Sequence, residues 1–277
     1  MRKSPDIWKE VLIEGKVDTD LVSGAMYSLG CLGIIEDKNR VRVYFESGKS
    51  LSKEQIISAL EEFGIKGAKI SFNTIADDGW SRRWEKYFEP VRIGEKIYIR
   101  PPWREKSGGN LVDIIINPGC AFGTGTHPTT QMALFFLEKY LEKGMAVLDA
   151  GCGSGILAIA AVKLGAGNVM CVDNDEGIKE NFYENISLNG IQEKVELKIC
   201  DVIDIDDFDF DLIVSNIDIK SNVKLLNSIG KFGEFPPRMI FTGILEKDME
   251  NFITQAETFG LKVTNTGTLK EWGAIVF

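Results

Sequence analysis

The sequence predicts an α/β protein with two domains, a smaller N-terminal α+β domain and a larger C-terminal domain on a mainly parallel, Rossmann-like sheet. Three observations predict this fold class. Short alternating patterns over residues 1–75 follow the βαββαβ order of a ferredoxin-like domain. From about residue 144, strands alternate with helices, as in right-handed βαβ units. A glycine-rich turn, GCGSG, joins the first strand of that series to its helix.

The N-terminal elements follow from apolar alternation and helix caps. WKEVLIEGKV reads as a strand, and DTDLVSGAMYSLG as a helix with Asp18 or Thr19 as its N-cap. CLGIIED and RVRVYFES read as a strand pair, and AKISFNTI as the last strand. Between them, LSKEQIISALEEFG carries a capping box of Ser52 and Gln55 and a stop at Gly64, which predicts a second helix.

A joint is expected at residues 76–95. Within ADDGWSRRWEKYFEPVR, the aromatic residues Trp80, Trp84, Tyr87 and Phe88 recur at helical spacing, and Pro90 ends the pattern. This texture predicts a helix that connects two domains. The predicted organisation is therefore a ferredoxin-like domain at 1–75, the joint, and a second domain at 96–277. The first domain is expected to be a recognition module or, alternatively, a purely structural appendage.

The C-terminal domain begins with two strands in KIYIRPPW and NLVDIIIN. AVLDA then gives a buried strand, and ILAIAAVKLGA a helix. The series continues with NVMCVDND, a helix in EGIKENFYENISLNG, VELKICDV, FDLIVSNI and RMIFTGI. The chain closes on GLKVTNTGTLKEWGAIVF, which predicts an antiparallel hairpin.

Composition narrows the function classes. A net charge of −9 disfavours direct nucleic-acid binding and would suit a basic partner. The five cysteines show no metal-type spacing, and the sequence has a single histidine, His127, so no metal site is expected. No signal peptide or membrane span is evident, so we expect a cytoplasmic protein. Nothing demands a second copy, and we expect a monomer.

The stretch CAFGTGTHPTT, residues 120–130, has two readings. Its threonines and proline precede the apolar run QMALFFLEKYL, so Thr129 or Thr130 can serve as the N-cap of a helix. Alternatively, Gly123 and Gly125 allow the backbone to approach a ligand closely.

The turn AVLDAGCGSG carries the strongest local signal. Gly151, Gly153 and Gly155 follow a strand and open a helix, where glycine permits a tight turn against a ligand. Asp173 closes the next strand, and a carboxylate there can accept hydrogen bonds from both hydroxyls of a ribose. Together they predict a nucleoside-containing cofactor.

The type of turn selects among such cofactors. It reads G-x-G-x-G, whereas a dinucleotide turn reads G-x-G-x-x-G. Asp149 just before it would repel a pyrophosphate but suits a sulfonium and an amino group, which S-adenosylmethionine carries. Asp201, after the next strand, falls where it can accept from an adenine amine, or it is one of several loop acids.

Asn216 ends the strand DLIVSNI at the edge where open α/β sheets bind ligands. An amide both donates and accepts hydrogen bonds, which suits a neutral amine held in line with a methyl group. We therefore expect Asn216 to be catalytic, with a turn or cap asparagine as the alternative.

The segments CAFGTGTHPTTQMAL, VLDAGCGSGILAIAAVKLGA, VDND and DLIVSNI together resemble the PrmA family of ribosomal protein L11 methyltransferases. The resemblance extends over most of residues 76–277, including FTGIL and the terminal EWGAIVF. It implies a seven-strand, S-adenosylmethionine-dependent methyltransferase domain that modifies lysine side chains and the α-amine of ribosomal protein L11 and releases S-adenosylhomocysteine. The N-terminal domain would dock that protein.

The resemblance also assigns roles to residues. The stretch matching GTGTHPTT is a loop over the cofactor in this family, and Thr130 matches its contact to S-adenosylmethionine. Gly151, Asp173 and Asn216 match other cofactor positions. Thr126 and His127 would line the loop, and we add Gly153, Asp149 and Asp201 to the predicted cofactor site.

One residue departs from the family pattern, which usually has an apolar residue after the isoleucine of its ANI motif. This chain has Asp218 there, which either favours a cationic substrate or faces solvent. Three other functions stay open: a protein-lysine methyltransferase with a different substrate, a non-catalytic cofactor-binding scaffold and, more remotely, a nicotinamide oxidoreductase.

Overall fold

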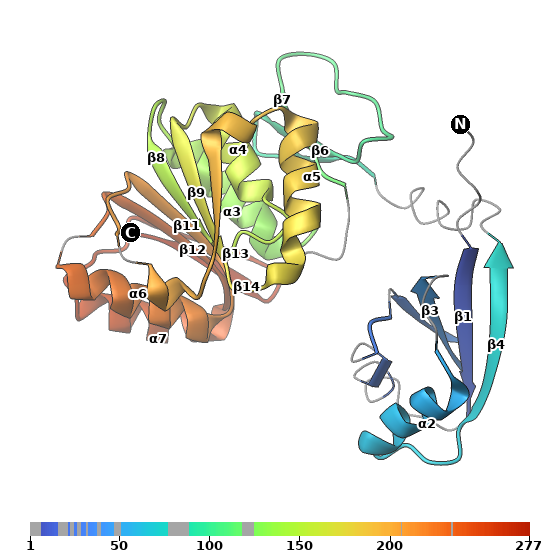
Figure 1. Cartoon of the computed structure of the whole chain (residues 1–277). Coiled ribbons are helices and arrows are strands. Elements are labelled where there is room, and N and C mark those ends of the chain that lie inside the picture. The colour runs from blue at the N-terminus through green and yellow to red at the C-terminus, as the bar shows by residue number, and fades with distance from the viewer. Residues whose placement is uncertain are drawn as a thin grey trace. The chain divides into compact units, whose positions relative to one another are not determined.

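The computed structural model describes two compact units, residues 1–87 and 88–277, which we take one at a time (Figure 1). The described residues are 7–15, 22, 25–26, 29–31, 33–37, 40–46, 51–76, 89–117, 125–205, 207–233 and 235–277. Within these ranges, none of the helices has the length and apolar character needed to cross a bilayer.

The first unit is an antiparallel sheet in the order β2-β3-β1-β4. Its described elements are β1 (Ile7–Glu14), β2 (Gly33–Asp37), β3 (Arg40–Glu46), α2 (Lys53–Glu62) and β4 (Lys69–Ala76). This strand order is that of a ferredoxin-like domain, as predicted. Most of the predicted first helix lies outside the described residues, but Val22, Ala25 and Met26 are buried in the unit's core.

Helix α2 begins and ends where its sequence predicts. The hydroxyl of Ser52 accepts from the Gln55 N–H at 3.2 Å, and the Gln55 side chain accepts from the Ser52 N–H at 2.9 Å. Gly64 follows the helix at a φ of 82°, a conformation that L side chains rarely adopt. The predicted capping box and glycine stop are therefore confirmed.

The second unit contains a seven-stranded sheet in the order β10-β9-β8-β11-β12-β14-β13. The strands from β10 to β12 are parallel, and β14 joins antiparallel to both β12 and β13. Figure 1 shows α3, α4 and α5 on one face and α6 and α7 on the other. The predicted fold class, including the closing hairpin, is confirmed.

The elements of this sheet and its helices have the following bounds: α3 (Pro128–Tyr140), β8 (Ala146–Ala150), α4 (Ile156–Leu164), β9 (Asn168–Asp173), α5 (Lys179–Asn189), β10 (Val195–Ile199), β11 (Leu212–Asn216), α6 (Ile219–Phe232), β12 (Arg238–Leu245), α7 (Met249–Glu257), β13 (Asn265–Leu269) and β14 (Trp272–Val276). Helices α6 and α7 were not among the elements predicted from the sequence. Both are amphipathic helices that cover the second face of the sheet.

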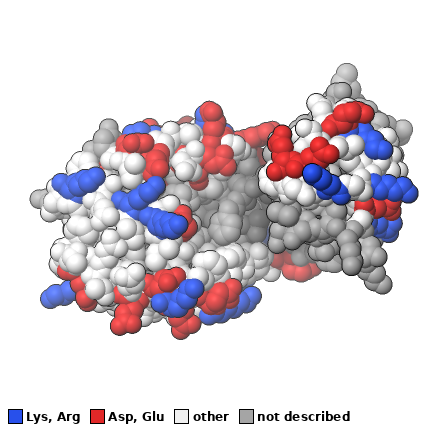
Figure 2. All heavy atoms as spheres, turned by 90° about the horizontal axis from the view of Figure 1, so that it is seen from below, with Lys and Arg blue, Asp and Glu red and all other residues white. Residues whose placement is uncertain are grey.

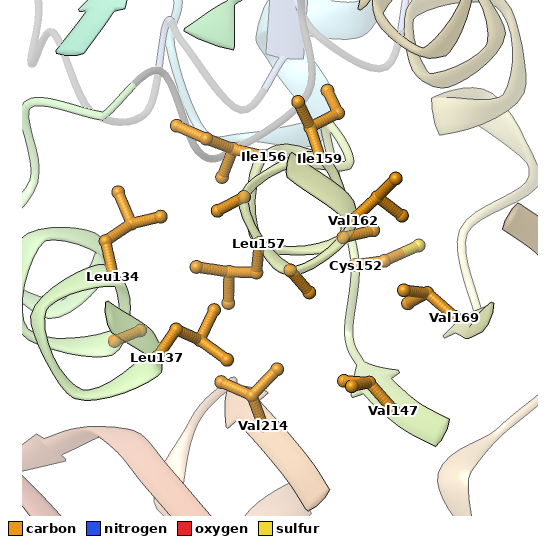
Figure 3. Close-up of a cluster of buried hydrophobic side chains, with 14 of the residues drawn as sticks. Leu134, Leu137, Val147, Cys152, Ile156, Leu157, Ile159, Val162, Val169 and Val214 are labelled. Atoms are coloured by element: carbon orange, nitrogen blue, oxygen red, sulfur yellow. The ribbon is translucent and has the colours of Figure 1, made fainter. Parts of the chain in front are cut away.

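The first seven residues of helix α4, 156–162, are all apolar and are buried between the sheet and the neighbouring helices. Figure 3 shows Leu134 and Leu137 of α3 packed against Leu157, with Val147 and Val214 of the sheet below. All five side chains are at most 3% exposed. This packing fixes the start of α4, and with it the glycine turn that precedes the helix.

A separate sheet in the order β5-β6-β7 precedes α3. It consists of β5 (Val91–Ile93), β6 (Ile97–Arg100) and β7 (Val112–Ile115), with β5 antiparallel and β7 parallel to β6. The predicted strands in KIYIRPPW and NLVDIIIN are thus confirmed. The predicted connecting helix lies almost wholly at 77–88, outside the described residues.

The free edge of β7 is occupied by asparagine side chains of α5. The Asn189 amide accepts from the Ile115 N–H at 3.0 Å and donates to the Ile115 carbonyl at 2.6 Å. The Asn185 amide accepts from the Asn117 N–H at 2.8 Å, and Asn181 donates to the Asn117 carbonyl at 3.1 Å. We call Asn181, Asn185 and Asn189 the asparagine ladder.

Candidate functional site

The glycine turn between β8 and α4 is shaped by positive φ angles. Gly151, Gly153 and Gly155 have φ values of 79°, 49° and 80°. The Gly151 N–H donates to the Val172 carbonyl of β9 at 2.7 Å, so the turn is tied to the neighbouring strand. A Cβ on Gly151 would overlap the side chain of Ile217. The turn therefore requires glycine in both conformation and space.

Asp173 ends β9 beside this turn. Its Oδ2 accepts from the Gly153 N–H at 2.9 Å, and its Oδ1 accepts from the Asp175 N–H at 3.0 Å. Each carboxylate oxygen keeps a further lone pair after these contacts. Asp173 is thus held in one orientation with acceptor capacity left for a ligand.

Asp149 lies beneath the turn. Its side chain is fully buried, and Oδ2 accepts from the Ala158 N–H at 3.0 Å, while Oδ1 has no hydrogen-bond partner among the described residues. Desolvation raises the pKa of Asp149 to about 7, with a smaller contribution from the charge of Asp173. Asp149 is therefore part of the support for the turn and does not line the cleft above it.

Asn216 ends β11 beside the turn, since Ser215 before it pairs with Ala150, the residue before Gly151. Its Nδ2 donates to the hydroxyl of Thr130 at 3.2 Å, and its Oδ1 accepts from the hydroxyl of Thr242 at 3.0 Å. Thr130 is fully buried in the first turn of α3. Thr130 does not line the cleft; it contacts the lining residue Asn216 from behind.

The start of α3 corrects the expected cap. His127 is the N-cap, and its Nδ1 accepts from the Thr129 N–H at 3.3 Å. Thr129 and Thr130 therefore lie inside the helix, because Pro128 takes the first helical position, where its missing N–H costs nothing. The His127 ring also meets Trp272 edge to face at 5.2 Å between centroids. Residues 118–124 lie outside the described residues.

These residues surround a cleft of about 660 Å³ at the carboxyl ends of the parallel strands. Six of the predicted site residues line it, namely His127, Gly151, Gly153, Asp173, Asp201 and Asn216. The other three do not: Thr130 and Asp149 are buried behind the lining, and Thr126 is exposed outside it. Further lining residues that the sequence analysis did not assign to the site are Thr129, Asn174, Asp175, Ile178, Val202, Ile217, Ser221, Lys224, Gly243 and Trp272.

The cleft has an acidic lining. Its lining contains one lysine, Lys224, and four carboxylates, those of Asp173, Asp175, Asp201 and Asp218. Asp201 also accepts from the Ile203 N–H at 3.2 Å, which fixes it at the end of β10. Over the face in Figure 2, Lys and Arg side chains are interspersed with Asp and Glu. The lining favours a cationic ligand and disfavours a phosphate.

Asp218 has a structural role as well as a place in the lining. It is the N-cap of α6, and its Oδ1 accepts from the N–H groups of Lys220 and Ser221 at 2.9 and 3.2 Å. The Ser221 hydroxyl also donates to it at 2.6 Å, and this hydrogen bond holds the pKa of Asp218 below its usual range. The departure from the family pattern thus supplies a helix cap.

The chemistry of the site combines fixed acceptors on one side with a neutral amide on the other. Among the described residues, no His, Cys, Asp and Glu side chains group as three metal ligands would. The glycine turn and Asp173 can hold a nucleoside, and Asn216 can bind an amine. This arrangement suits group transfer between a bound nucleoside donor and an amine acceptor.

Comparisons with known proteins identify the family to which this chain is similar. The family model "Ribosomal protein L11 methyltransferase (PrmA)" matches residues 14–277. A ribosomal protein L11 methyltransferase of Caldicellulosiruptor bescii is 31% identical over 300 residues, covering 97% of this chain and 98% of that protein. A ribosomal protein L11 methyltransferase of Ruminiclostridium cellulolyticum is 34% identical over 247 residues, covering 86% of this chain and 78% of that protein. A crystal structure of a ribosomal protein L11 methylase from Lactobacillus delbrueckii subsp. bulgaricus, 28% identical, superposes with a TM-score of 0.63 over 68% of this chain and 97% of that one.

Proposed function

The chain belongs to the PrmA family of ribosomal protein L11 methyltransferases, and from that premise we propose that it methylates lysine side chains and the α-amine of ribosomal protein L11, with S-adenosylmethionine as donor. One observation carries the proposal most directly. Asn216 and Asp173 line the same cleft, and we assign the first to the amine and the second to the nucleoside. The family membership makes the related methyltransferase with another substrate the less favoured function.

The residues of the cleft fit S-adenosylmethionine. The glycine turn leaves backbone exposed to a ligand, and Asp173 keeps acceptor capacity for the two ribose hydroxyls. Asp201 and Val202 line the part of the cleft after β10, where an adenine ring would lie. The acidic lining suits the amino group and the sulfonium, and the ligand has no phosphate for it to repel.

The methyl transfer itself needs orientation more than acid-base chemistry. The donor, when bound, supplies a methyl group already activated by its sulfonium. Asn216 would accept a hydrogen bond from the attacking amine and keep its lone pair aimed at that group. His127 and Trp272 form an aromatic wall of the cleft that would exclude water from the amine. The product of the donor is S-adenosylhomocysteine.

Substrate recognition is the role we propose for the first unit. It has its own buried core and contributes no residue to the described lining of the cleft. The net charge of −9 suits a basic ribosomal protein and disfavours nucleic acid as a direct ligand. Removing residues 1–87 should abolish methylation of L11 while S-adenosylhomocysteine binding persists. Retained methylation would refute this role.

We further propose that the protein acts as a monomer in the cytoplasm, where a ribosomal protein of the kind named for its relatives is made. Light scattering on the purified protein, alone and with L11, would measure its mass. A stable dimer would contradict the proposal.

Mass spectrometry tests the activity. Purified L11 incubated with the enzyme and S-adenosylmethionine should gain mass in steps of one methylene, and an Asp173→Ala control should show no gain. Calorimetric binding of S-adenosylmethionine without any gain would retain the donor and reject L11 as the substrate. Absence of binding would reject the donor too.

A further inference from the structure

Beneath Asn216 lies a buried hydroxyl that the proposed mechanism does not yet use. Thr242 of β12 is paired with Asn216 in the register of the two parallel strands, and its side chain is fully buried. Its Oγ1 donates to the Asn216 Oδ1 at 3.0 Å and lies 3.4 Å from the Ser215 carbonyl, a longer second contact. Thr242 is therefore a hydrogen-bond donor directed at the amide oxygen.

The other end of the amide has a matching acceptor. Asn216 Nδ2 donates to the Thr130 hydroxyl at 3.2 Å. The two threonines thus contact opposite ends of one planar group, from β12 and from α3. With both contacts made, the amide oxygen points toward β12 and the amide nitrogen toward α3.

The position of Thr242 is fixed by its backbone. The Asn222 side chain, itself buried, donates to the Thr242 carbonyl at 2.8 Å and to the Ile217 carbonyl at 3.0 Å. The next residue, Gly243, has a φ of 80°, and a Cβ there would overlap the Ile217 carbonyl. The backbone of Thr242 therefore stays in place beside Asn216, and its hydroxyl stays within hydrogen-bond reach of the amide.

This fixed orientation matters for an amine acceptor. A neutral amine attacks through its lone pair, so its N–H groups need acceptors and its lone pair must stay free. An amide oxygen has two lone pairs; Thr242 takes one and leaves the other for the amine. A rotated amide would present N–H donors, which would bind the lone pair and suppress attack.

We propose that Thr242 is a positioning residue for methyl transfer, which orients the Asn216 amide so that its oxygen meets the acceptor amine. The proposal rests on the proposed function of this site and adds a residue to it. Because Thr242 acts through Asn216, its contribution should disappear when the amide is absent.

A double-mutant cycle with L11 as acceptor tests this dependence. Thr242→Val removes the hydroxyl and keeps the shape, and kcat should fall by about tenfold while the affinity for S-adenosylhomocysteine stays within about twofold. Thr242→Ser retains the hydroxyl and should restore most of kcat. In an Asn216→Ala background, Thr242→Val should cause no further loss. An equal further loss there, an unchanged kcat in Thr242→Val, or no recovery in Thr242→Ser would overturn the proposal.

A second measurement separates this proposal from the proposed function. In protein labelled with ¹⁵N at asparagine side chains and saturated with S-adenosylhomocysteine, the Asn216 NH₂ pair is identified by its loss in Asn216→Ala. In the wild type and in Thr242→Ser, the two NH₂ protons should keep distinct chemical shifts. In Thr242→Val, the two proton signals should exchange with each other or change their chemical shifts. An unchanged pair in Thr242→Val would overturn the positioning role, even if the wild type failed to methylate L11.

Discussion

The two sides of the cleft differ in how they are built. On the β8–β9 side, Asp173 accepts from the Gly153 N–H of the glycine turn, and Asp149 accepts from the Ala158 N–H of α4. On the β11–β12 side, neutral amides and hydroxyls bind one another, as Asn216 does with Thr242. The difference follows from the two ligands: a cationic donor is stabilised by carboxylates, whereas an acceptor amine must reach the site neutral. Carboxylates therefore bind the backbone on the donor side, and neutral groups orient Asn216 on the acceptor side.

Removing Asp173 should have the largest effect, a loss of cofactor affinity on the β8–β9 side. Asp173→Ala deletes the acceptor for the ribose and leaves the Gly153 N–H unpaired. We expect S-adenosylhomocysteine affinity to fall by at least about 100-fold, or about 3 kcal/mol, by calorimetry. Asp175→Ala is the matched control, since Asp175 also lines the cleft but, among the described residues, its side chain binds only the Gly177 N–H. Equal losses in both variants would show that the acidic lining acts as a whole.

The buried carboxyl on the same side should make stability depend on pH. The pKa of Asp149 is raised from 3.8 to about 7 in the folded protein, so the folded state holds this proton more tightly than the unfolded chain. The associated stability is present at acidic pH and is lost as pH rises from about 4 through 7.

The test compares urea unfolding of the wild type and Asp149→Asn across that range. Relative to the variant, the wild type should lose at most about 4 kcal/mol between pH 4 and pH 7, and nothing more above it. A constant difference across the range would mean that Asp149 titrates normally.

Gly151 lies where the β8–β9 side of the cleft meets the β11–β12 side. A Cβ there would overlap Ile217, the residue after β11, and the φ of 79° adds backbone strain. Gly151→Ala should therefore lower the free energy of unfolding by about 3 kcal/mol. Gly144 has a φ of 91° and open space around it, so Gly144→Ala should cost only about 1 kcal/mol. Similar costs would mean that Ile217 moves aside freely.

The asparagine ladder gives the smallest expected effect. Asn185 also donates to the Ser154 carbonyl of the glycine turn at 3.0 Å, whereas Asn189 reaches only the Ile115 backbone and its own helix. Asn185→Leu and Asn189→Leu should each lower the unfolding free energy by about 2 kcal/mol. Only Asn185→Leu should also weaken S-adenosylhomocysteine binding, by about fivefold. Equal affinity for S-adenosylhomocysteine in the two variants would show that the asparagine ladder does not support the glycine turn.

Residues at the ends of parallel strands were predictable from the sequence. Gly151, Asp173 and Asn216 each follow a buried strand, and such ends meet at one edge of the sheet. The sequence also placed Asp149 near the turn, but not below it, because the depth of a side chain depends on packing. The N-cap of α3 was mistaken because Pro128 was placed before the helix and lies in its first position.

Residues brought in by strand order were not predictable. Gly243 reaches the cleft because β12 pairs with β11, and Trp272 because β14 lies beside β12, both far along the chain from the glycine turn. No local pattern reveals this strand order. The omission of α6 was avoidable, since Asp218 is a good N-cap residue and Leu225, Leu226 and Ile229 follow at helical spacing.

The asparagine ladder also bears on how the protein stays separate from its copies. Strand β7 lies at the edge of its sheet, and an open edge strand is a template for pairing with another molecule. Here the outward N–H and C=O groups of Ile115 and Asn117 are already bound by side-chain amides of α5. A helix thus blocks the edge as a neighbouring strand would, without itself exposing a new one, and protects the domain against aggregation at this point.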